Sequence, residues 1–264
     1  NSEPWDNLKY DEKGVDEVRR KFFGTLYNTY SFFSGYANVD AFDNETAQVP
    51  VAERPEIDRW VLSVLNTLVK GVQKEMESYD PTRAGRLIED FVNNDLSNWY
   101  VRLNRKRFWG KEMSQDKLAA YQTLYTCLTT VAKLLAPFAP FFADQLFCDL
   151  GAAQLENTTS VHLAKFPVAD ESLIDRELEE RMGMAQKITS MVHALRKKVN
   201  IAVRQPLQAI MIPAVDDEQR RHIEAVKDLI LSEVNVKELR FVEGSGVLVK
   251  KVKCNFRTMG KKFG

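Results

Sequence analysis

Cysteine and histidine are scarce in this 264-residue chain, which has three of each. The cysteines are odd in number and widely spaced, so they predict neither a disulfide framework nor the paired ligands of a zinc ribbon. No histidine has a partner at metal-ligand spacing. These absences predict no metal site and are typical of a protein from the reducing cytosol. The residues are Cys127, Cys148, Cys254, His162, His193 and His222.

Long apolar runs and an excess of one charge are also missing. No stretch reaches the roughly 18 apolar residues that a membrane-spanning helix needs, and the polar start NSEPWDN does not look like a signal peptide. The 37 basic and 37 acidic residues cancel, so attraction to an anionic partner must come from a local patch. We expect a soluble, cytoplasmic, monomeric protein with no membrane partner.

Motifs for nucleotide binding and catalysis are absent as well. Gly244 and Gly246 lie between two strand candidates, so they read as a turn rather than as a phosphate-binding loop. Glu89 and Asp90 are neighbours on a helix, and their carboxylates therefore point in different directions. We expect neither a catalytic site nor a bound cofactor within this chain.

What the sequence does contain is helical periodicity. Its residues are 44% apolar and 10% aromatic, which is enough for a large core. Apolar side chains recur every three or four positions, and Asp80 with Pro81 marks one helix start. The predicted helices cover residues 14–36, 56–78, 81–109, 115–135 and 141–150, with a long surface loop at 38–54. Because the other connections are short, we predict an antiparallel helical bundle.

The second half of the chain changes character. Residues 153–172 predict a linker that passes through a short extended segment at 160–163. A long helix over 174–199 follows, acidic at its start and basic at its end, as the helix dipole favours. Strands are predicted at 207–212, 236–242 and 247–252, with a helix at 218–232. The predicted fold is mainly α, with a bundle over 1–152, a linker over 153–172, and a long helix plus a small α/β domain over 173–264.

Residues 95–111, DLSNWYVRLNRKRFWGK, interleave cations and aromatic rings more densely than any other stretch. Five cations and no acid lie between residues 99 and 111, so an anionic partner is the natural complement. On a helix, one stripe is formed by Asn98, Arg102, Arg105 and Trp109, and a nearly opposite, packing stripe by Leu96, Tyr100 and Leu103. One face of this segment is therefore predicted to pack while the other binds.

The chemistry of this segment favours single-stranded RNA, because guanidinium groups bind phosphates and Trp stacks on exposed bases. A solvated basic helix with buried tryptophans is the open alternative. Arg107 lies near the packing stripe, so its charge has to snorkel or find a partner. The apolar face of residues 81–91 does not continue smoothly, which predicts a kink near Asn93 and Asn94 or a passage from one core to another.

Candidate RNA-binding residues come from three places. The first helix carries polar residues on its outer face, and residues 244–264 hold six cations and no acid, which suits contacts with phosphates. The complete set is Arg19, Arg20, Asn28, Asn98, Trp99, Arg102, Arg105, Lys106, Trp109, Lys250, Lys251 and Lys253.

Several stretches resemble the isoleucyl-tRNA synthetase family of class I aminoacyl-tRNA synthetases, in its anticodon-binding, C-terminal part. They are WDNLKYDEKGVDEVRRKFFGTLYNTYSFF, DLSNWYVRLNRKRFWG followed by AYQTLYTCLTTVAKLLAPFAPFFAD, SVHLAKFP, KVNIAVRQPLQAIMIP and LILSEVNVKEL. They occur in the order of the family and cover essentially the whole chain.

This resemblance implies a helical, anticodon-binding fragment whose partner is the anticodon arm of isoleucine tRNA. The parent ligase uses ATP and Mg²⁺ and has catalytic and editing domains, which are the other implied partners. The His-Ile-Gly-His and Lys-Met-Ser-Lys-Ser elements are absent here, so the resemblance places catalysis upstream of this chain. The Cys pairs of the zinc-bearing C-terminus found in many bacterial relatives are absent too.

A helical module that docks on another protein is the competing function, because a basic and aromatic face also suits a protein interface. The two functions differ in their response to salt. Phosphate contacts weaken steeply as salt rises, whereas an aromatic protein interface responds much less.

Overall fold

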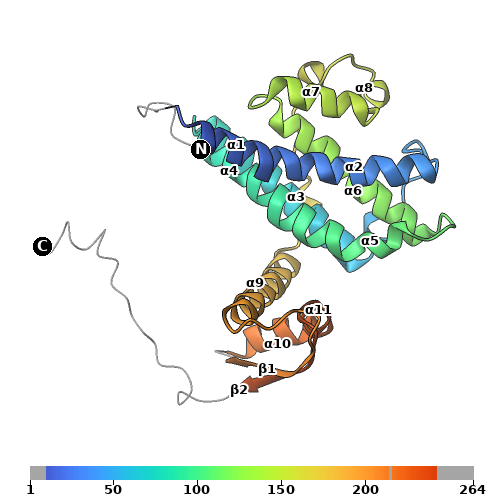
Figure 1. The fold of residues 1–264 in the computed structure, drawn as a ribbon. Coiled ribbons are helices and arrows are strands. Elements are labelled where there is room, and N and C mark those ends of the chain that lie inside the picture. Colours follow the sequence, from blue (N-terminus) through green and yellow to red (C-terminus); the bar gives the residue numbers. More distant parts are fainter. Residues whose placement is uncertain (1–9, 214–215, 243–264) are drawn as a thin grey trace, which may run out of the picture. The chain divides into compact units, whose positions relative to one another are not determined.

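The computed structural model describes residues 10–213 and 216–242 (Figure 1). These residues are mainly helical with one small sheet, which confirms the predicted fold class. The chain divides into two compact units, Asn1–Glu179 and Glu180–Gly264. The domain boundaries drawn from the sequence, at 152 and 173, stay predictions.

The first unit is a set of helices joined by mostly short connections. Its α-helices are α1 (Glu12–Val18), α2 (Gly24–Val39), α3 (Glu56–Glu77), α4 (Pro81–Asp90), α5 (Arg102–Phe108), α6 (Gln115–Leu135), α7 (Pro140–Asp149) and α8 (Ala152–Leu155). It also contains the π-helices η1 (Arg19–Phe23) and η3 (Phe91–Val101) and the 3₁₀ turns η2 (Val51–Glu53), η4 (Val161–Leu163) and η5 (Glu171–Leu173). Two long helical runs result, α1–η1–α2 and α4–η3–α5.

Local sequence signals set several helix starts. The Asp80 side chain accepts a hydrogen bond from the backbone N of Arg83 at 2.9 Å, with Pro81 at the first helical position of α4. The Ser114 hydroxyl does the same for the backbone N of Lys117 at 3.2 Å. These side chains satisfy backbone donors that have no partner in a helix's first turn. The predicted starts of both helices are confirmed.

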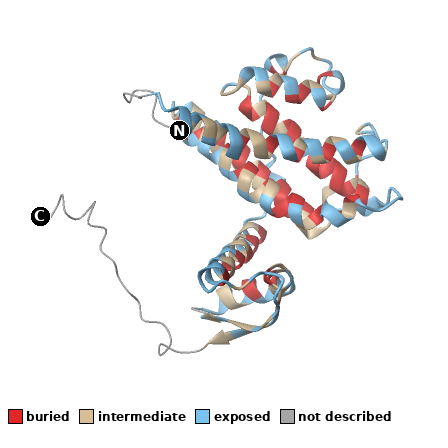
Figure 2. Ribbon diagram, in the orientation of Figure 1, coloured by how far each residue is buried: buried red, intermediate tan, exposed pale blue. Residues whose placement is uncertain are grey.

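The core of the first unit is built around α6. Buried residues occur on nearly every side of this helix (Figure 2). Leu124, Leu128 and Ala132 are fully buried, and α2, α3, α4, α5 and α7 all contact α6. A helix that neighbours cover on all sides is apolar around most of its circumference. Its burial is therefore wider than the single seam that the spacing predicted.

The change of face near Asn93 and Asn94 has a specific cause. Instead of a break, the run continues through the π-helix η3. Hydrogen bonds in a π-helix run from residue i to i+5, so each turn takes an additional residue and the side-chain phase slips. Leu96 and Tyr100 are consequently fully buried beyond η3's start, in continuity with Ile88 on α4. The interruption that the sequence predicted is a phase slip.

The long loop between α2 and α3 is held by one buried cation. Arg54 is 6% exposed, and it donates to the Val49 carbonyl at 2.9 Å and to the Thr123 hydroxyl at 2.9 Å. The Gln122 side-chain oxygen accepts from the backbone N of Val49 at 2.9 Å. These contacts fasten the end of the loop to α6.

The prediction of a short extended segment at 160–163 is wrong. Residues Val161–Leu163 form the 3₁₀ turn η4. The Asp144 carboxylate on α7 accepts from the Ser160 hydroxyl at 2.6 Å and from the backbone N of Val161 at 2.9 Å. Two hydrogen bonds to one carboxylate require a tight turn, and this requirement overrides the β preference of the valine.

The second unit contains most of α9 (Arg176–Lys198) and a small α/β arrangement. Strands β1 (Leu207–Pro213) and β2 (Val236–Val242) pair in parallel, and α10 (Asp217–Ala225) and α11 (Lys227–Val234) connect them. Parallel pairing requires such a crossover connection. The predicted strands at 207–212 and 236–242 are confirmed, the single predicted helix is divided near Val226, and the predicted strand at 247–252 lies outside the described residues.

Candidate nucleic-acid interface

The exposed side of η3 and α5 carries the predicted stripe. Its members Asn98, Arg102, Arg105 and Trp109 are all exposed, as is the neighbouring Lys106, and we call these five residues the basic face. Trp109 is 57% exposed, so the expectation that it is available to a partner agrees with its position. The opposite stripe packs, with Leu96 and Tyr100 fully buried and Leu103 half-buried. The predicted division of this segment into a packed and an exposed face is confirmed, and binding by the exposed face stays a prediction.

The prediction that Trp99 belongs to the RNA-binding site is wrong. It is 4% exposed, because the π-helix turns its side chain into the protein. Its indole N–H is buried and lacks a hydrogen-bond partner among the described residues. The Arg102 guanidinium lies over its ring at 5.8 Å from the centroid. Trp99 is therefore unavailable for stacking on a base. Its ring instead makes a cation–π contact with the Arg102 guanidinium.

The cations of the basic face differ in how firmly they are held. Arg102 Nε donates to the Asn98 carbonyl at 2.9 Å, which fixes the guanidinium plane beside Asn98. Among residues 10–213 and 216–242, no acidic side chain pairs with Arg105 or Lys106. Unneutralised cations on one exposed surface produce the local positive potential that a phosphate backbone prefers.

Arg107, whose charge lies near the packing stripe, has acidic partners. Its Nη1 and Nη2 donate to the two oxygens of Asp58 on α3, at 2.7 and 2.8 Å. Nη1 also donates to the Asn104 side chain at 3.0 Å, and Nε to the Asp116 carboxylate at 3.0 Å. Burial alone would lower the pKa of Arg107, but hydrogen bonds to Asp58 hold that pKa above its ordinary value. The predicted need for a partner is confirmed.

Tyr100 completes the buried part of this network. Its hydroxyl donates to Asp58 Oδ1 at 2.7 Å, so Asp58 accepts from both a tyrosine and an arginine. Burial and the neighbouring Asp58 charge raise the pKa of Tyr100 well above its usual value. The phenol therefore stays protonated and remains a donor. The basic face rests on this network, which links α3, η3, α5 and α6.

The α1–η1–α2 run packs against the run that carries the basic face. Residues of η1 contact η3, and the Phe32 and Tyr36 rings of α2 pack on Phe108 of α5 with centroids 5.1 and 6.3 Å apart. The two runs are therefore side by side and point the same way (Figure 1). Asn28 is exposed on α2, the helix that packs against α5.

Arg19 and Arg20, also predicted at the site, are exposed but not free of partners. Both guanidinium groups pair with Asp16, at 2.6 and 2.7 Å. Hydrogen bonding to Arg19, followed by the charges of both arginines, lowers the pKa of Asp16. The net charge of this cluster is thus smaller than its arginines suggest. Lys250, Lys251 and Lys253 lie outside the described residues.

Two important residues were missed by sequence reasoning. The buried Lys117 and the partly buried Asp40 form an ion pair at 2.5 Å, next to the turn that follows Trp109. A lysine at an apolar position of α6, four residues before Tyr121, is the only sequence signal for it. Asp40 lies 77 positions earlier in the chain, and no local pattern connects the two.

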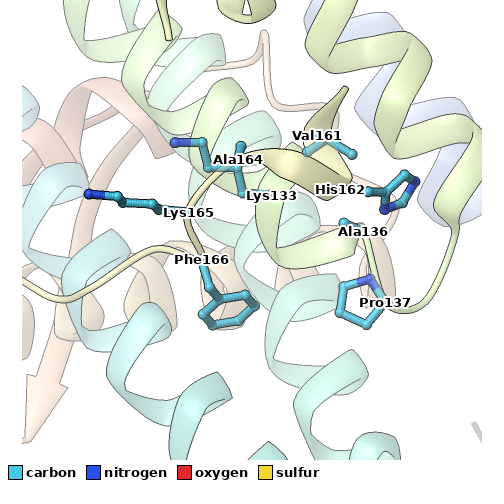
Figure 3. A pocket seen from close by; sticks show the side chains of 8 residues that line it. All are labelled: Lys133, Ala136, Pro137, Val161, His162, Ala164, Lys165 and Phe166. Carbon is cyan, nitrogen blue, oxygen red and sulfur yellow. The ribbon is translucent and has the colours of Figure 1, made fainter. Parts of the chain in front are cut away.

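One hollow of the first unit lies away from the basic face. It measures about 310 Å³ and lies between the end of α6 and residues 161–166 (Figure 3). Phe166 and Pro137 contribute apolar surface, whereas Lys165 extends away from the Phe166 ring. Lys133, its least exposed cation, already pairs with Glu156 at 2.5 Å. The other lysine of the lining, Lys165, is a single exposed cation, and we assign this hollow no ligand.

Within the described residues, no group of three or more His, Cys, Asp or Glu side chains could hold a metal ion. No helix among those residues is long and apolar enough to span a membrane.

Comparison with known proteins identifies relatives of the whole chain. A family model described as the anticodon-binding domain of tRNA ligase matches residues 58–211, more than half of the chain. Isoleucine–tRNA ligases from Bacteroides thetaiotaomicron and Porphyromonas gingivalis are 68% and 62% identical over 100% of the chain, which covers 23% of each ligase. The isoleucine–tRNA ligase of Clostridium novyi is 40% identical over 100% of the chain, which covers 25% of that ligase. The chain thus spans about a quarter of these relatives' length.

Proposed function

We propose that this chain, which belongs to the anticodon-binding domain family of tRNA ligases, reads the anticodon arm of isoleucine tRNA. Similarity over the full chain to isoleucine–tRNA ligases supports the choice of isoleucine. In this proposal the chain is one part of a longer, cytoplasmic and monomeric ligase that joins isoleucine to its tRNA. ATP and Mg²⁺ bind in the ligase's catalytic domain, and an editing domain is a further partner.

One observation carries the proposal. Trp109 is exposed beside a set of cations, and Arg105 and Lys106 have no acidic partner among the described residues. An exposed Trp leaves a large apolar ring in contact with water and contributes nothing to the core. Stacking on a base covers that ring and is therefore favourable. Cations on the same face bind the phosphates beside that base. This combination suits an unpaired RNA loop better than a helical duplex.

Each residue of the basic face then has a definite role. Arg102 and Arg105 bind phosphates of the anticodon arm, and Lys106 adds a third positive charge. Trp109 stacks on one base, and the Asn98 side-chain amide hydrogen-bonds a base edge. Arg102 is directed by its bond to the Asn98 carbonyl at 2.9 Å, so the base-reading and phosphate-binding groups are held together.

The remaining candidates act at the edges of this surface. Asn28, on the neighbouring helix, contacts the RNA backbone. Arg19 and Arg20 share Asp16, so their contribution is smaller than that of Arg105. Lys250, Lys251 and Lys253 bind phosphates without reading sequence, which predicts that their replacement by Gln weakens binding to different tRNAs to a similar degree.

The salt dependence of binding tests the proposal. The affinity of the chain for an isoleucine tRNA transcript is measured between 50 and about 200 mM salt, the range over which phosphate contacts weaken strongly. Arg105→Gln should reduce the slope of log affinity against log salt by about 0.7 to 0.9, the share of one phosphate. Arg83→Gln is the matched control, because Arg83 is exposed on α4 of the same run and pairs with Asp80 at 3.3 Å.

The possible outcomes separate the two function classes. A wild-type slope of zero, or equal effects of Arg105→Gln and Arg83→Gln, would contradict an RNA-binding face. A flat salt response together with docking of the chain on another protein would favour the protein-interaction module. Amino-acid-dependent pyrophosphate exchange by this chain alone would contradict the view that catalysis belongs to another part of the ligase.

A further inference from the structure

A buried lysine ends the turn that presents Trp109. Lys117 lies in the first turn of α6 and is 2% exposed. Its ammonium donates to the Gly110 carbonyl at 2.6 Å and pairs with the Asp40 carboxylate at 2.5 Å. Gly110 directly follows Trp109, and Asp40 is the C-cap of α2. The Lys117 side chain therefore joins α6, the end of α2 and the turn after α5, directly next to the exposed Trp109.

The acceptor Asp40 is itself held in place. The Tyr121 hydroxyl donates to Asp40 Oδ2, and the Tyr121 ring stacks on Phe42 with centroids 4.9 Å apart. The same ring meets Phe108 edge-on, also with centroids 4.9 Å apart. Burial works against the charge of Asp40, but the hydrogen bonds from Lys117 and Tyr121 lower its pKa below the usual value. Lys117 and Tyr121 together therefore favour the ionised carboxylate and fix its position.

The other end of the turn is tied as well. Arg107 Nη2 donates to the Asp116 carbonyl at 2.8 Å, and Phe108 is 1% exposed. Trp109 is therefore preceded by a buried ring and followed by a carbonyl that Lys117 holds. The indole itself is 57% exposed between these two anchored neighbours.

General stability does not by itself require a lysine at this position. Removing two charges from water costs several kcal/mol in general, and replacing a buried ion pair by apolar side chains is often neutral or stabilising. An apolar residue could fill the site of Lys117, but it could not donate to the Gly110 carbonyl. An ammonium beside the last carbonyls of α5 also offsets their partial negative charge, which would otherwise oppose an approaching phosphate.

We propose that Lys117 is a positioning residue for Trp109: it holds the Gly110 carbonyl so that the exposed indole meets a base of the bound RNA in one orientation. The proposal rests on the proposed function, because it concerns the same surface. Lys117 is buried and touches no RNA. Its effect reaches the RNA through Trp109, by reducing the ordering that binding would otherwise require.

A double-mutant cycle tests this role on the complete 264-residue chain. Lys117→Met keeps the length of the side chain but removes its donors, and it should lower affinity for an isoleucine tRNA transcript roughly three- to ten-fold. The salt slope should not change, since no phosphate contact is lost. In a Trp109→Ala background, Lys117→Met should lower affinity no further, because residues that act as a unit are not additive. Equal effects of Lys117→Met in both backgrounds would overturn the proposal.

Lys133 provides a matched control on the same helix. It pairs with Glu156 at 2.5 Å and lies 5.9 Å from the Phe147 ring centroid, much as Lys117 lies 5.9 Å from the Tyr121 ring centroid. Lys133→Met should destabilise the fold without changing affinity. Equal losses of affinity for both methionine variants would reduce the role of Lys117 to general stability and overturn the proposal.

A second variant covers the case in which Lys117→Met does not fold. Asp40→Asn has the same shape and keeps an oxygen acceptor, while it weakens the attraction that holds the ammonium. It should lower the affinity for the transcript by at most about two- to three-fold. As with Lys117→Met, this loss should occur only when Trp109 is present. An effect that persists in Trp109→Ala would overturn the proposal. Failure of the wild-type chain to bind the transcript would instead contradict the proposed function, so the two failures are distinguishable.

Discussion

Arg107 and Asp58 meet through two parallel hydrogen bonds, Nη1 to Oδ1 at 2.7 Å and Nη2 to Oδ2 at 2.8 Å. The Asp58 side chain is 0% exposed and that of Arg107 is 15% exposed. This bidentate pair fixes α5 against α3, and the cations of the basic face project from the other side of the same helix. The charge of Arg107 is thus paired inside the protein, whereas the charge of Arg105 is exposed to solvent.

Removing one member of this pair should be costly. Asp58→Ala should lower the free energy of unfolding by about 3 to 5 kcal/mol, because it leaves a buried guanidinium and the Tyr100 hydroxyl without their acceptor. Asp116→Asn is the control, since that carboxylate is 52% exposed and its loss should cost less than about 1 kcal/mol. Urea denaturation measures both. Similar losses for the two variants would show that the bidentate pair has no special weight.

The buried phenols predict a stability change at alkaline pH. The pKa of Tyr100 is raised above its ordinary value of 10.0 in the folded chain, by burial first and then by the Asp58 charge. A raised pKa means that the unfolded chain loses its proton first, so stability is fully present below about pH 10 and falls as pH rises through that value. Tyr100→Phe should flatten this decline relative to wild type, as measured by urea denaturation between pH 8 and about 11.

Tyr27→Phe is the control for that experiment, because Tyr27 is 59% exposed and its replacement removes a phenol from solvent rather than from the core. Its pH profile should follow that of wild type. If Tyr100→Phe declined as steeply as wild type above pH 10, the Tyr100 phenol would not be the group that couples folding to pH.

Arg196 is the corresponding anchor of the second unit. It is 2% exposed and donates to four carbonyls, those of Ala202, Gln205, Val234 and Asn235, at 2.8 to 3.1 Å. Arg196→Met should destabilise this unit by about 2 kcal/mol, because one buried and three partly buried carbonyls lose their donor. Arg196→Lys should rescue little, since one ammonium cannot match the planar fork of the guanidinium. The solvent-facing neighbour variant Lys197→Met should be nearly neutral, and full rescue by lysine in thermal unfolding would contradict the role of the fork.

Periodicity alone could predict which residues of 95–111 face solvent. The stripe of Asn98, Arg102, Arg105 and Trp109 follows from helical spacing, and the difficulty with Arg107 was visible because a charge fell on a packing stripe. The partner was not visible. Asp58 lies 49 positions earlier in the chain, and only the packing of α3 against η3 brings it within reach.

Trp99 marks the limit of that reasoning. It lies next to exposed Asn98 in the sequence and in a segment rich in cations, so composition gave it the same role as Trp109. On a regular helix, residues ten positions apart point about 80° from each other, which leaves both near one surface. The π-helix changes the phase between them, and no residue type in Phe91–Val101 announces the i to i+5 bonding that produces it.

The two tryptophans should therefore respond in opposite ways to the same substitution. Trp99→Ala should lower the free energy of unfolding by about 3 to 5 kcal/mol, the usual cost of truncating a buried Trp. Trp109→Ala should change stability by no more than about 0.5 kcal/mol, as exposed substitutions do, and should weaken binding to an isoleucine tRNA transcript by about 1 to 3 kcal/mol. Its salt slope should stay that of wild type, because a lost stack releases no counterion. Thermal unfolding and tRNA affinity measured on both variants decide the matter: a Trp109→Ala chain that unfolds early yet binds normally would return Trp109 to the core and leave the basic face without its stacking ring.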